Sequence, residues 1–438
     1  MSLSSPVFIF AFLPLSFFAH RAIKSGRGKN ICLALLSLLF LSFGKLWHTA
    51  VLLLSLLLYY FAGLAIKRSG SRFALGASIA AALGILCAFK YSGNLPLGIS
   101  YFSFQGISYL IDVFRDRELA TKDPVKLLLC IAFFPRLSSG PIVKYHELEH
   151  QIDNPALSPE MTASGIEKFI IGLAKKLLIA DFMAKAVTAF KGAEDFRCAW
   201  LFAVCYMLQL YYDFSGYSDM AIGLGRIFGY DFGENFLLPY GSASLKEFWR
   251  KWHISLSSWF RDYLYIPLGG NRKGKLRAAF NRLAVFLCTG LWHGAGWTFL
   301  FWGAGHWLLV TLEDLKIIPV KALERSRAGR ILCRAYTLLS VMLLFVIFRC
   351  ETLSAAFFQI GAMFTAPAAA GSSLLLASVL SPAFCFSLLA GLLLAGRLPE
   401  KLKTDNRILK ESACLALFLL CLCAMARGDS APFIYAQF

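Results

Sequence analysis

The chain has 438 residues, of which 58% are hydrophobic and only 16% are charged, and its mean hydropathy is +0.62. This composition excludes a string of ordinary soluble domains and favours a polytopic membrane protein, whose spans each need about 20 apolar residues. The net charge of +18 would suggest nucleic-acid binding in a soluble protein. Here the basic residues occupy short loops between apolar runs, where the positive-inside bias explains them without nucleic acid.

In chain order, apolar runs predict membrane-embedded helices over 6–19, 31–44, 46–66, 73–91, 96–114 and 127–134. Prolines and a glycine then break the helix, and the polar stretch 144–160 predicts a loop. A helical pattern returns over 166–190. Apolar helix-forming runs interrupted by polar side chains follow over 206–306, and further spans are predicted over 335–348, 374–395 and 414–426. We therefore predict an all-α polytopic membrane protein with about eleven to thirteen membrane-embedded helices, forming one domain over 1–438.

The sequence predicts neither disulfides nor a metal site. The 12 Cys residues are scattered, mostly within apolar runs, without a CxxC pair or Cys/His ligand spacing. They are best interpreted as small buried hydrophobic residues. Asp213, Asp219 and a histidine also lack close ligand spacing.

Two histidines lie in the central stretch, where polar side chains interrupt apolar runs. His293 stands between Leu291–Trp292 and a Gly-Ala-Gly segment, and ionisable groups in such surroundings tend to line a cavity. Burial would keep its imidazole neutral, as a general base requires. His253 lies at the polar border of an aromatic segment, so solvation at the membrane interface is its competing explanation.

Residues 244–261 predict one amphipathic helix. Trp249 and Trp252 belong to its aromatic face, and Lys246, Arg250 and Lys251 are among its cations. Such a helix lies in the headgroup layer. These three cations and two tryptophans are also candidates for binding an anionic donor, such as a nucleotide or phosphopantetheine thioester.

Two further sets of residues are candidates for substrate binding. The loop 267–275 carries Asn271 and Arg272 beside glycines, so its backbone amides could cradle phosphate. Asp213 and Ser215 recur at helical spacing with Ser218 and Asp219. Polar contacts between helices are the simpler role for them, because no GxSxG elbow presents a serine nucleophile.

Several motifs together resemble the membrane-bound O-acyltransferase superfamily, and within it the membrane subunits of bacterial polysaccharide O-acetyltransferases such as those for alginate. They are PLGISYFSFQGISYLID, FFPRLSSGPIVKY, YYDFSGYSDMAIGLG, EFWRKWHISLSSWFRDYLYIPLGGNR, TGLWHGAGWTFLFWG and the C-terminal FIYAQF. They span most of the chain in the family order. The chain is shorter than the alginate subunits, and Ala436 replaces the aromatic residue that is commoner at its position.

The resemblance implies a helical bundle around a funnel or tunnel, in a multi-pass protein of the bacterial cytoplasmic (inner) membrane. It implies that His293 is the catalytic histidine and that His253 is a second histidine on the donor side. The implied reaction passes an acyl group, above all acetyl, from a cytoplasmic thioester such as acetyl-CoA to an extracytoplasmic polysaccharide. A separate esterase-like or acetyltransferase-like protein outside the membrane would receive the group, and no cofactor beyond the donor is expected.

Two alternatives remain open. The branch of the superfamily that transfers D-alanine to teichoic acids shares several of the motifs, although YLYIPLGGNR favours acetylation. A transporter of polysaccharide precursors would use His293 and Asp213 as a relay, but it predicts two inverted halves with matching broken helices. The sequence shows no such matched pair.

The basic segments 24–29, 67–72, 325–334 and 401–410 are expected to face the cytoplasm. Single cysteines placed there, in a background without exposed native thiols, should resist an impermeant thiol reagent in intact cells. Ready labelling of any of the four segments would contradict this topology.

Overall fold

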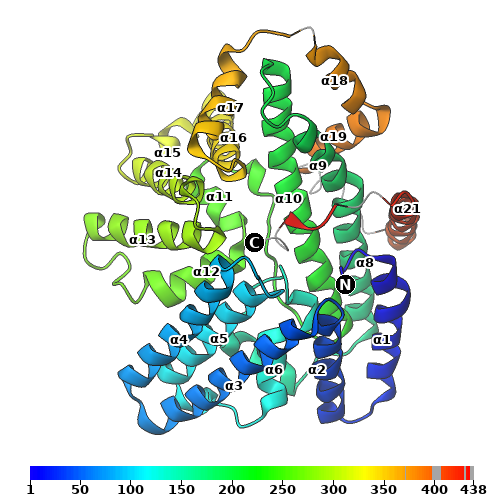
Figure 1. Ribbon diagram of the computed structural model, residues 1–438, viewed down its shortest axis with the longest axis vertical. Coiled ribbons are helices and arrows are strands. Elements are labelled where there is room, and N and C mark those ends of the chain that lie inside the picture. The colour runs from blue at the N-terminus through cyan, green and yellow to red at the C-terminus, as the bar shows by residue number, and fades with distance from the viewer. Residues whose placement is uncertain (370, 397–405, 429–430, 435–438) are drawn as a thin grey trace. The chain divides into compact units, whose positions relative to one another are not determined.

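The computed structural model describes residues 1–369, 371–396, 406–428 and 431–434. Every regular element assigned within these ranges is a helix, which confirms the all-α prediction. Figure 1 labels most of these helices along the chain. The first elements are η1 Phe8–Phe12, α1 Leu13–Ala22, α2 Gly26–Ser42, α3 Leu46–Ser69, α4 Arg72–Tyr91, α5 Ile99–Arg115, η2 Arg117–Leu119, α6 Pro124–Ala132, η3 Phe134–Arg136, α7 Tyr145–Asp153 and α8 Pro159–Ala174.

The middle of the chain forms η4 Lys175–Ala180, α9 Asp181–Ala189, α10 Phe196–Ile227, η5 Pro239–Gly241, α11 Leu245–Lys251, α12 Ile254–Phe260, η6 Arg261–Tyr265, α13 Lys275–His293 and α14 Trp297–Asp314. The last elements are α15 Val320–Leu323, α16 Arg327–Arg349, α17 Leu353–Thr365, α18 Ser372–Val379, α19 Pro382–Leu394 and α21 Arg407–Ala426.

The helices divide into two compact units. The first comprises the described residues of 1–173, 217–234 and 433–438, and the second those of 174–216 and 235–432. The long helix α10 therefore contributes residues to both units, and neither unit is one continuous stretch of chain. The single domain over 1–438 stays a prediction.

Close helix packing in the first unit depends on glycines. In the group formed by α3, α4 and α5 (Figure 1), the ring of Tyr109 lies against Gly63 and the ring of Tyr59 against Gly106. Where α8 crosses α10, a Cβ on Gly223 would lie 2.5 Å from the carbonyl oxygen of Gly165. Small residues of this kind let helix backbones approach closely in membrane proteins.

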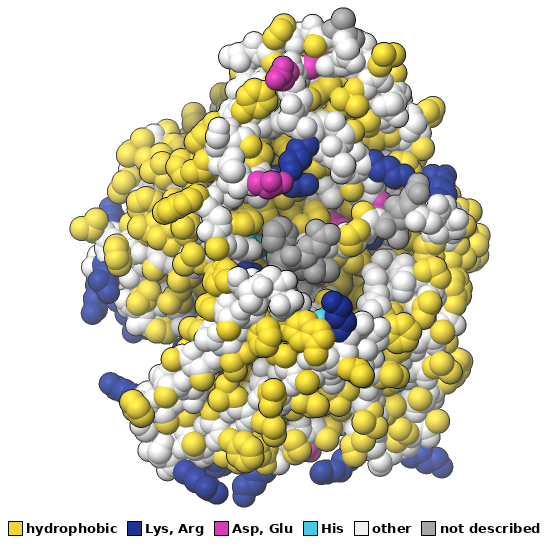
Figure 2. Space-filling model, viewed as in Figure 1, with side chains coloured by type: hydrophobic (Ala, Val, Ile, Leu, Met, Phe, Trp, Pro, Cys, Tyr) yellow, Lys and Arg dark blue, Asp and Glu magenta, His cyan; other side chains and the backbone are white. Residues whose placement is uncertain are grey.

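Several helices meet the requirements for crossing a membrane. Among the described residues, α3, α4, α16 and α21 are long and apolar enough, and α18 with α19 makes a fifth if that bent pair is one span. Figure 2 shows hydrophobic side chains over much of the visible face, including the region of α3 and α4. These helices support a multi-pass membrane protein. The larger number expected from the sequence stays a prediction, because many other helices are shorter or carry more charge.

Two predicted elements differ from the structure. The expected loop 144–160 contains α7, because Tyr145, Leu148 and Ile152 bury one side of an otherwise polar helix. The expected helix 374–395 is bent by 77° between α18 and α19. Pro382 begins α19, and the Ser381 hydroxyl accepts a hydrogen bond from the Phe384 amide, so a new helix starts there.

The crossing of α8 and α10 gives a test of the fold. Gly223→Ala should lower the free energy of unfolding by about 1–3 kcal/mol, because the added methyl group meets backbone atoms of Gly165 and Phe169. Gly84→Ala on α4 is the matched control, since a Cβ there meets nothing within 4 Å. Thermal unfolding in detergent, followed by tryptophan fluorescence, measures both variants. Equal melting temperatures for the two would contradict the close crossing.

Candidate active site

The predicted amphipathic helix 244–261 is broken at His253, so the prediction of one continuous helix is wrong. The backbone of His253 is left-handed, with φ 45° and ψ 55°, a conformation that non-glycine residues rarely adopt. The amide of Trp252 still donates to the carbonyl of Phe248, which ends α11. The amide of Ile254 instead donates to the carbonyl of Asn235 at 3.0 Å, and α12 begins at this residue.

The side chain of Asn235 fixes the tautomer of His253. Asn235 Oδ1 accepts from the Ser255 amide at 3.1 Å and from the Ser255 hydroxyl at 2.9 Å, so this atom is the amide oxygen. His253 Nδ1 lies 3.3 Å from the same oxygen and must therefore donate to it. The neutral ring then keeps its lone pair on Nε2, which is buried and has no hydrogen-bond partner in the described part of the chain.

His293 is the last residue of α13 and is also buried, with 5% of its surface exposed. Its ring lies among aromatic rings, with centroid distances of 4.9 Å to Phe348 and 5.4 Å to Trp302. The chain leaves the helix at Gly294, whose added Cβ would collide with the ring of Phe299. A larger residue after His293 would therefore displace the ring of Phe299, which also contacts His293.

Both histidines contact Trp292. The centroid of Trp292 is 6.3 Å from that of His253 and 4.7 Å from that of His293. Phe214 adds an edge-on ring at 4.6 Å from His253. Two histidines 40 positions apart in sequence (253 and 293) are thereby brought to one buried, aromatic cluster in the second unit.

The two tryptophans predicted to bind substrate are packed within this unit. Trp249 Nε1 donates to His306 Nδ1 at 3.2 Å, and its ring contacts Phe286 and Trp302. Trp252 is buried and stacks on Phe248 at 5.4 Å. Their surroundings are those of core residues rather than of an exposed entrance.

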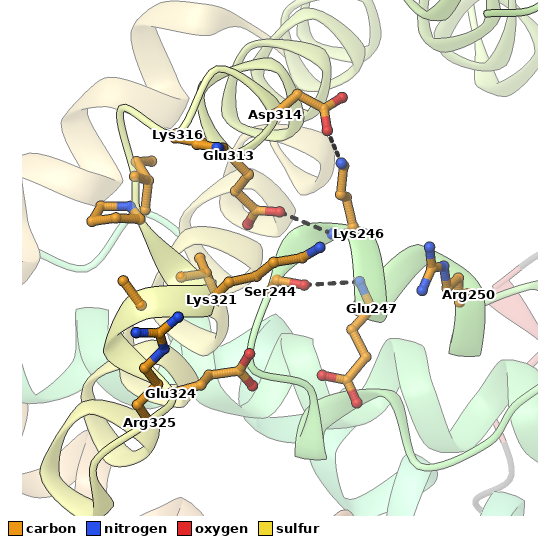
Figure 3. Close-up of a pocket in the computed structure, with 14 residues that line it drawn as sticks. Ser244, Lys246, Glu247, Arg250, Glu313, Asp314, Lys316, Lys321, Glu324 and Arg325 are labelled. Carbon is orange, nitrogen blue, oxygen red and sulfur yellow. Dashed lines mark hydrogen bonds and ion pairs between the residues drawn. The ribbon is translucent and has the colours of Figure 1, made fainter.

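The three predicted cations of α11 have different surroundings. Lys246 pairs with Asp314, and Lys251 pairs with Glu247 at 2.7 Å. Arg250 is exposed, and with Lys246 it lines a pocket of about 680 Å³ (Figure 3), whereas Lys251 is not among the lining residues.

The predicted phosphate cradle is a surface loop. Asn271 and Arg272 are exposed and are not among the residues that line that pocket. The loop is held by Asn281, whose amide donates to the carbonyls of Leu268 and Gly270 at 3.3 and 2.9 Å.

Asp213 belongs to a buried charge network. Lys176 Nζ lies 2.7 Å from Asp213 Oδ1 and 2.8 Å from Asp181 Oδ1, and all three residues are buried. Lys176 is in η4, a short π-helix, which is a feature often found at functional sites. Ser215 is buried nearby on the same helix, and its hydroxyl has no hydrogen-bond partner among the residues described. The contacts of Asp213 match the structural role weighed from the sequence.

Comparison with known proteins identifies the family to which this chain belongs. The family model described as MBOAT, membrane-bound O-acyltransferase family, matches residues 94–354. The chain belongs to this family. Both histidines, the cations of α11 and the buried charge network all fall within the matched residues.

The names of related proteins refer to several different polymers. "Probable alginate O-acetylase AlgI" of Pseudomonas fluorescens is 38% identical over 382 residues, covering 83% of this chain and 76% of the relative. "Peptidoglycan O-acetyltransferase" of Helicobacter pylori is 36% identical, covering 71% and 70%. "Teichoic acid D-alanyltransferase" of Bacillus subtilis is 33% identical, covering 49% and 58%.

The sequence pattern did not single out Asn235, which supports His253, or His306, which accepts a hydrogen bond from Trp249. Asn235 lies ten positions before Leu245, the first residue of α11. Nothing in its local sequence marks it as a capping residue for α12. Only the tertiary fold brings the carboxamide of Asn235 to the start of α12.

The charge network of this acyltransferase gives a prediction for stability. Lys176→Met should lower the free energy of unfolding by about 3–5 kcal/mol, because it leaves the buried carboxylates of Asp181 and Asp213 without their cation. Lys185→Met, at an exposed position of α9, is the control and should change little. Denaturant titration in mixed micelles measures both variants. A similar small effect for both would contradict an energetically coupled network.

Proposed function

We propose that the protein transfers an acetyl group from a cytoplasmic thioester, such as acetyl-CoA, for the O-acetylation of an extracytoplasmic polysaccharide such as alginate. The observation that carries this proposal is the enclosure of His253 and His293 by one aromatic cluster with Trp292 between them. The names of the alginate and peptidoglycan relatives support acetyl as the group and a polysaccharide as the final acceptor.

In the proposed reaction, neutral His293 takes the proton from an acceptor hydroxyl as that oxygen attacks the thioester carbonyl carbon. The new C–O bond forms, the C–S bond breaks, and the thiolate that leaves takes the proton back from the imidazolium. General-base assistance of this kind contributes about 10²–10⁴-fold to the rate. The surrounding rings exclude water, so hydrolysis of the thioester would be suppressed.

His253 suits a second role on the donor side. Its Nδ1–H is committed to Asn235, so only Nε2 is available to accept a hydrogen bond or a proton. A direct transfer from thioester to acceptor needs no other cofactor, and we propose neither a metal nor a covalent acyl-enzyme. The acceptor would be a separate esterase-like or acetyltransferase-like protein outside the inner membrane, which passes the group to the polymer.

The D-alanyl branch is the second candidate, because the Bacillus subtilis teichoic acid D-alanyltransferase matches about half of the chain. It differs in the acyl group and the donor, so the same assay separates the two functions. Purified protein in lipid nanodiscs can be offered acetyl-CoA or a D-alanyl carrier protein. Consumption of only the second thioester would favour D-alanylation.

The central test is His293→Ala in this assay. Thioester consumption should fall by at least about 10²-fold, because the base that deprotonates the acceptor is lost. His150→Ala, which removes an exposed histidine of α7, is the control and should keep wild-type activity.

The melting temperature of each variant separates chemistry from folding. A folded His293→Ala variant with full activity would remove the base assignment. If wild-type protein consumed neither thioester in the presence of an acceptor, the proposed acyl transfer itself would be wrong.

A further inference from the structure

The last turn of α16 contacts two different parts of the second unit. Phe348 lies against the ring of His293, with the two ring centroids 4.9 Å apart. Arg349, the last residue of the helix, lies instead over the ring of Tyr206 on α10, with its guanidinium carbon 5.9 Å from the ring centroid. One helical turn thus connects the candidate catalytic histidine with a second group of polar side chains.

The charge of Arg349 has no acidic partner. Glu351 is the nearest acidic residue in sequence, but its carboxylate pairs with Lys191 at 2.6 Å. Within the described ranges of the chain, no ion pair joins Arg349 to a carboxylate. The end of a helix favours a cation, and the face of Tyr206 attracts one without carrying a net charge. The half-buried guanidinium therefore keeps N–H donors for an anion.

Two buried polar atoms on α10 lack hydrogen-bond partners among the described residues. Tyr206 is 1% exposed, its ring stacks on that of Phe202 at 6.4 Å, and its hydroxyl is one of these atoms. Gln209 Oε1 is the other. Positions three apart lie on the same face of a helix, so both atoms belong to one side of α10. A buried polar group in a native protein is expected to meet a protein group, water or a ligand.

The predicted topology assigns Arg349 to the extracytoplasmic side. The helix α16 is long and apolar enough to cross a membrane. It begins at Arg327, in the basic segment 325–334 that is expected to face the cytoplasm. Arg349 is its opposite end. A molecule that arrives from outside the cell membrane therefore reaches this end of α16 first.

We propose that Arg349 and Tyr206 bind a carboxylate of the protein that accepts the acyl group. The proposal rests on the proposed acyl transfer, in which the acceptor is a protein outside the membrane, and it adds the chemistry by which that acceptor is recognised. A guanidinium donates two parallel N–H groups to the two oxygens of a carboxylate, and the phenol hydroxyl donates one more hydrogen bond.

The charge at this subsite fits a carboxylate better than a phosphate. One unpaired cation matches the single negative charge of a carboxylate, whereas a phosphate monoester carries nearly two. Because Phe348 and Arg349 are consecutive, a carboxylate held at Arg349 would fix a neighbouring hydroxyl of the acceptor near His293. The subsite would thus select the acceptor and leave the thioester donor untouched.

The first experiment measures binding without a thioester. An N-acetylated, C-amidated serine–aspartate dipeptide and its serine–asparagine counterpart are titrated calorimetrically into purified full-length protein in detergent. Wild type should bind the acidic peptide at least about tenfold more tightly, which is the scale of a charge-assisted hydrogen bond. Arg349→Gln should bind both peptides equally. Arg327→Gln removes an exposed arginine from the other end of α16, so this control should keep the wild-type preference.

Tyr206→Phe tests the second donor. The change removes only a hydroxyl that has no partner within the described part of the chain, so the melting temperature should not fall. Binding of the acidic peptide should weaken roughly three- to tenfold. Tyr60→Phe, which removes a hydroxyl from α3 in the first unit, is the control and should bind as wild type does. Unchanged binding by Tyr206→Phe would overturn its part in the subsite.

The second experiment offers the same two peptides as acyl acceptors with acetyl-CoA. Wild type should show at least about tenfold higher kcat/KM for the acidic peptide, and Arg349→Gln should show equal values for both. Arg349→Lys should restore part of the preference, because it restores the charge without the fork. Damage to the fold would instead lower the rates with both peptides by the same factor, so retention of the preference in Arg349→Gln would overturn the proposal.

Failure of the subsite and failure of the enzyme activity are distinguishable. Equal affinity of wild type for the two peptides, or binding of neither, would overturn the subsite. A preference confined to methyl glucuronide over methyl glucoside would overturn the assignment to a protein and place a sugar carboxylate there instead. If wild type consumed no thioester with any acceptor, the acyl-transfer function would fail, while the titration would still decide whether Arg349 binds a carboxylate.

Discussion

The geometry of the candidate site depends on the buried carboxamide of Asn235. Its oxygen accepts the amide and hydroxyl of Ser255 and the Nδ1–H of His253, while its backbone carbonyl accepts the amide of Ile254. These bonds satisfy the first amides of α12, which would otherwise be left unpaired in a partly buried position. They also stabilise a left-handed histidine that would cost energy on its own. A strained backbone at this point orients the imidazole, so that Nε2 is the atom left for a ligand.

Buried charge in this protein is neutralised in two different ways. Lys176 is paired with two carboxylates. Arg136 has no carboxylate partner among the residues that the structure describes. It is fully buried and donates to the carbonyls of Leu129 and Cys130 at the end of α6, and to Gln105. The negative end of a helix dipole and its unpaired carbonyls can serve a cation in place of an acid. Both arrangements make a low-polarity interior compatible with ionised groups, as helices in a membrane protein require.

The aromatic residues have two roles that their sequence positions do not distinguish. Trp292 lies between His253 and His293, and Trp302 contacts both His293 and His306. Trp249 donates to His306 and belongs to the same packed interior, although the helical pattern placed it on a membrane-facing surface. A large aromatic residue fits an interface or a core equally well, because its ring is apolar and its N–H needs one partner in either place. Burial, and not residue type, separates the two.

The sequence alone determined the membrane class, the all-α architecture and the family, because composition, apolar run length and long motifs are local properties of the chain. It also singled out His293, since an imidazole in a glycine-rich apolar run stands out without any structure. Tertiary structure decided the break at His253, the two carboxylate partners of Lys176 and the gathering of His253 and His293 around Trp292. Each of these depends on contacts between segments far apart in the chain, and helical periodicity carries no information about which segments meet. The helix over 244–261 was predicted as continuous for that reason: its pattern is helical throughout, and the hydrogen bonds that end it come from Asn235.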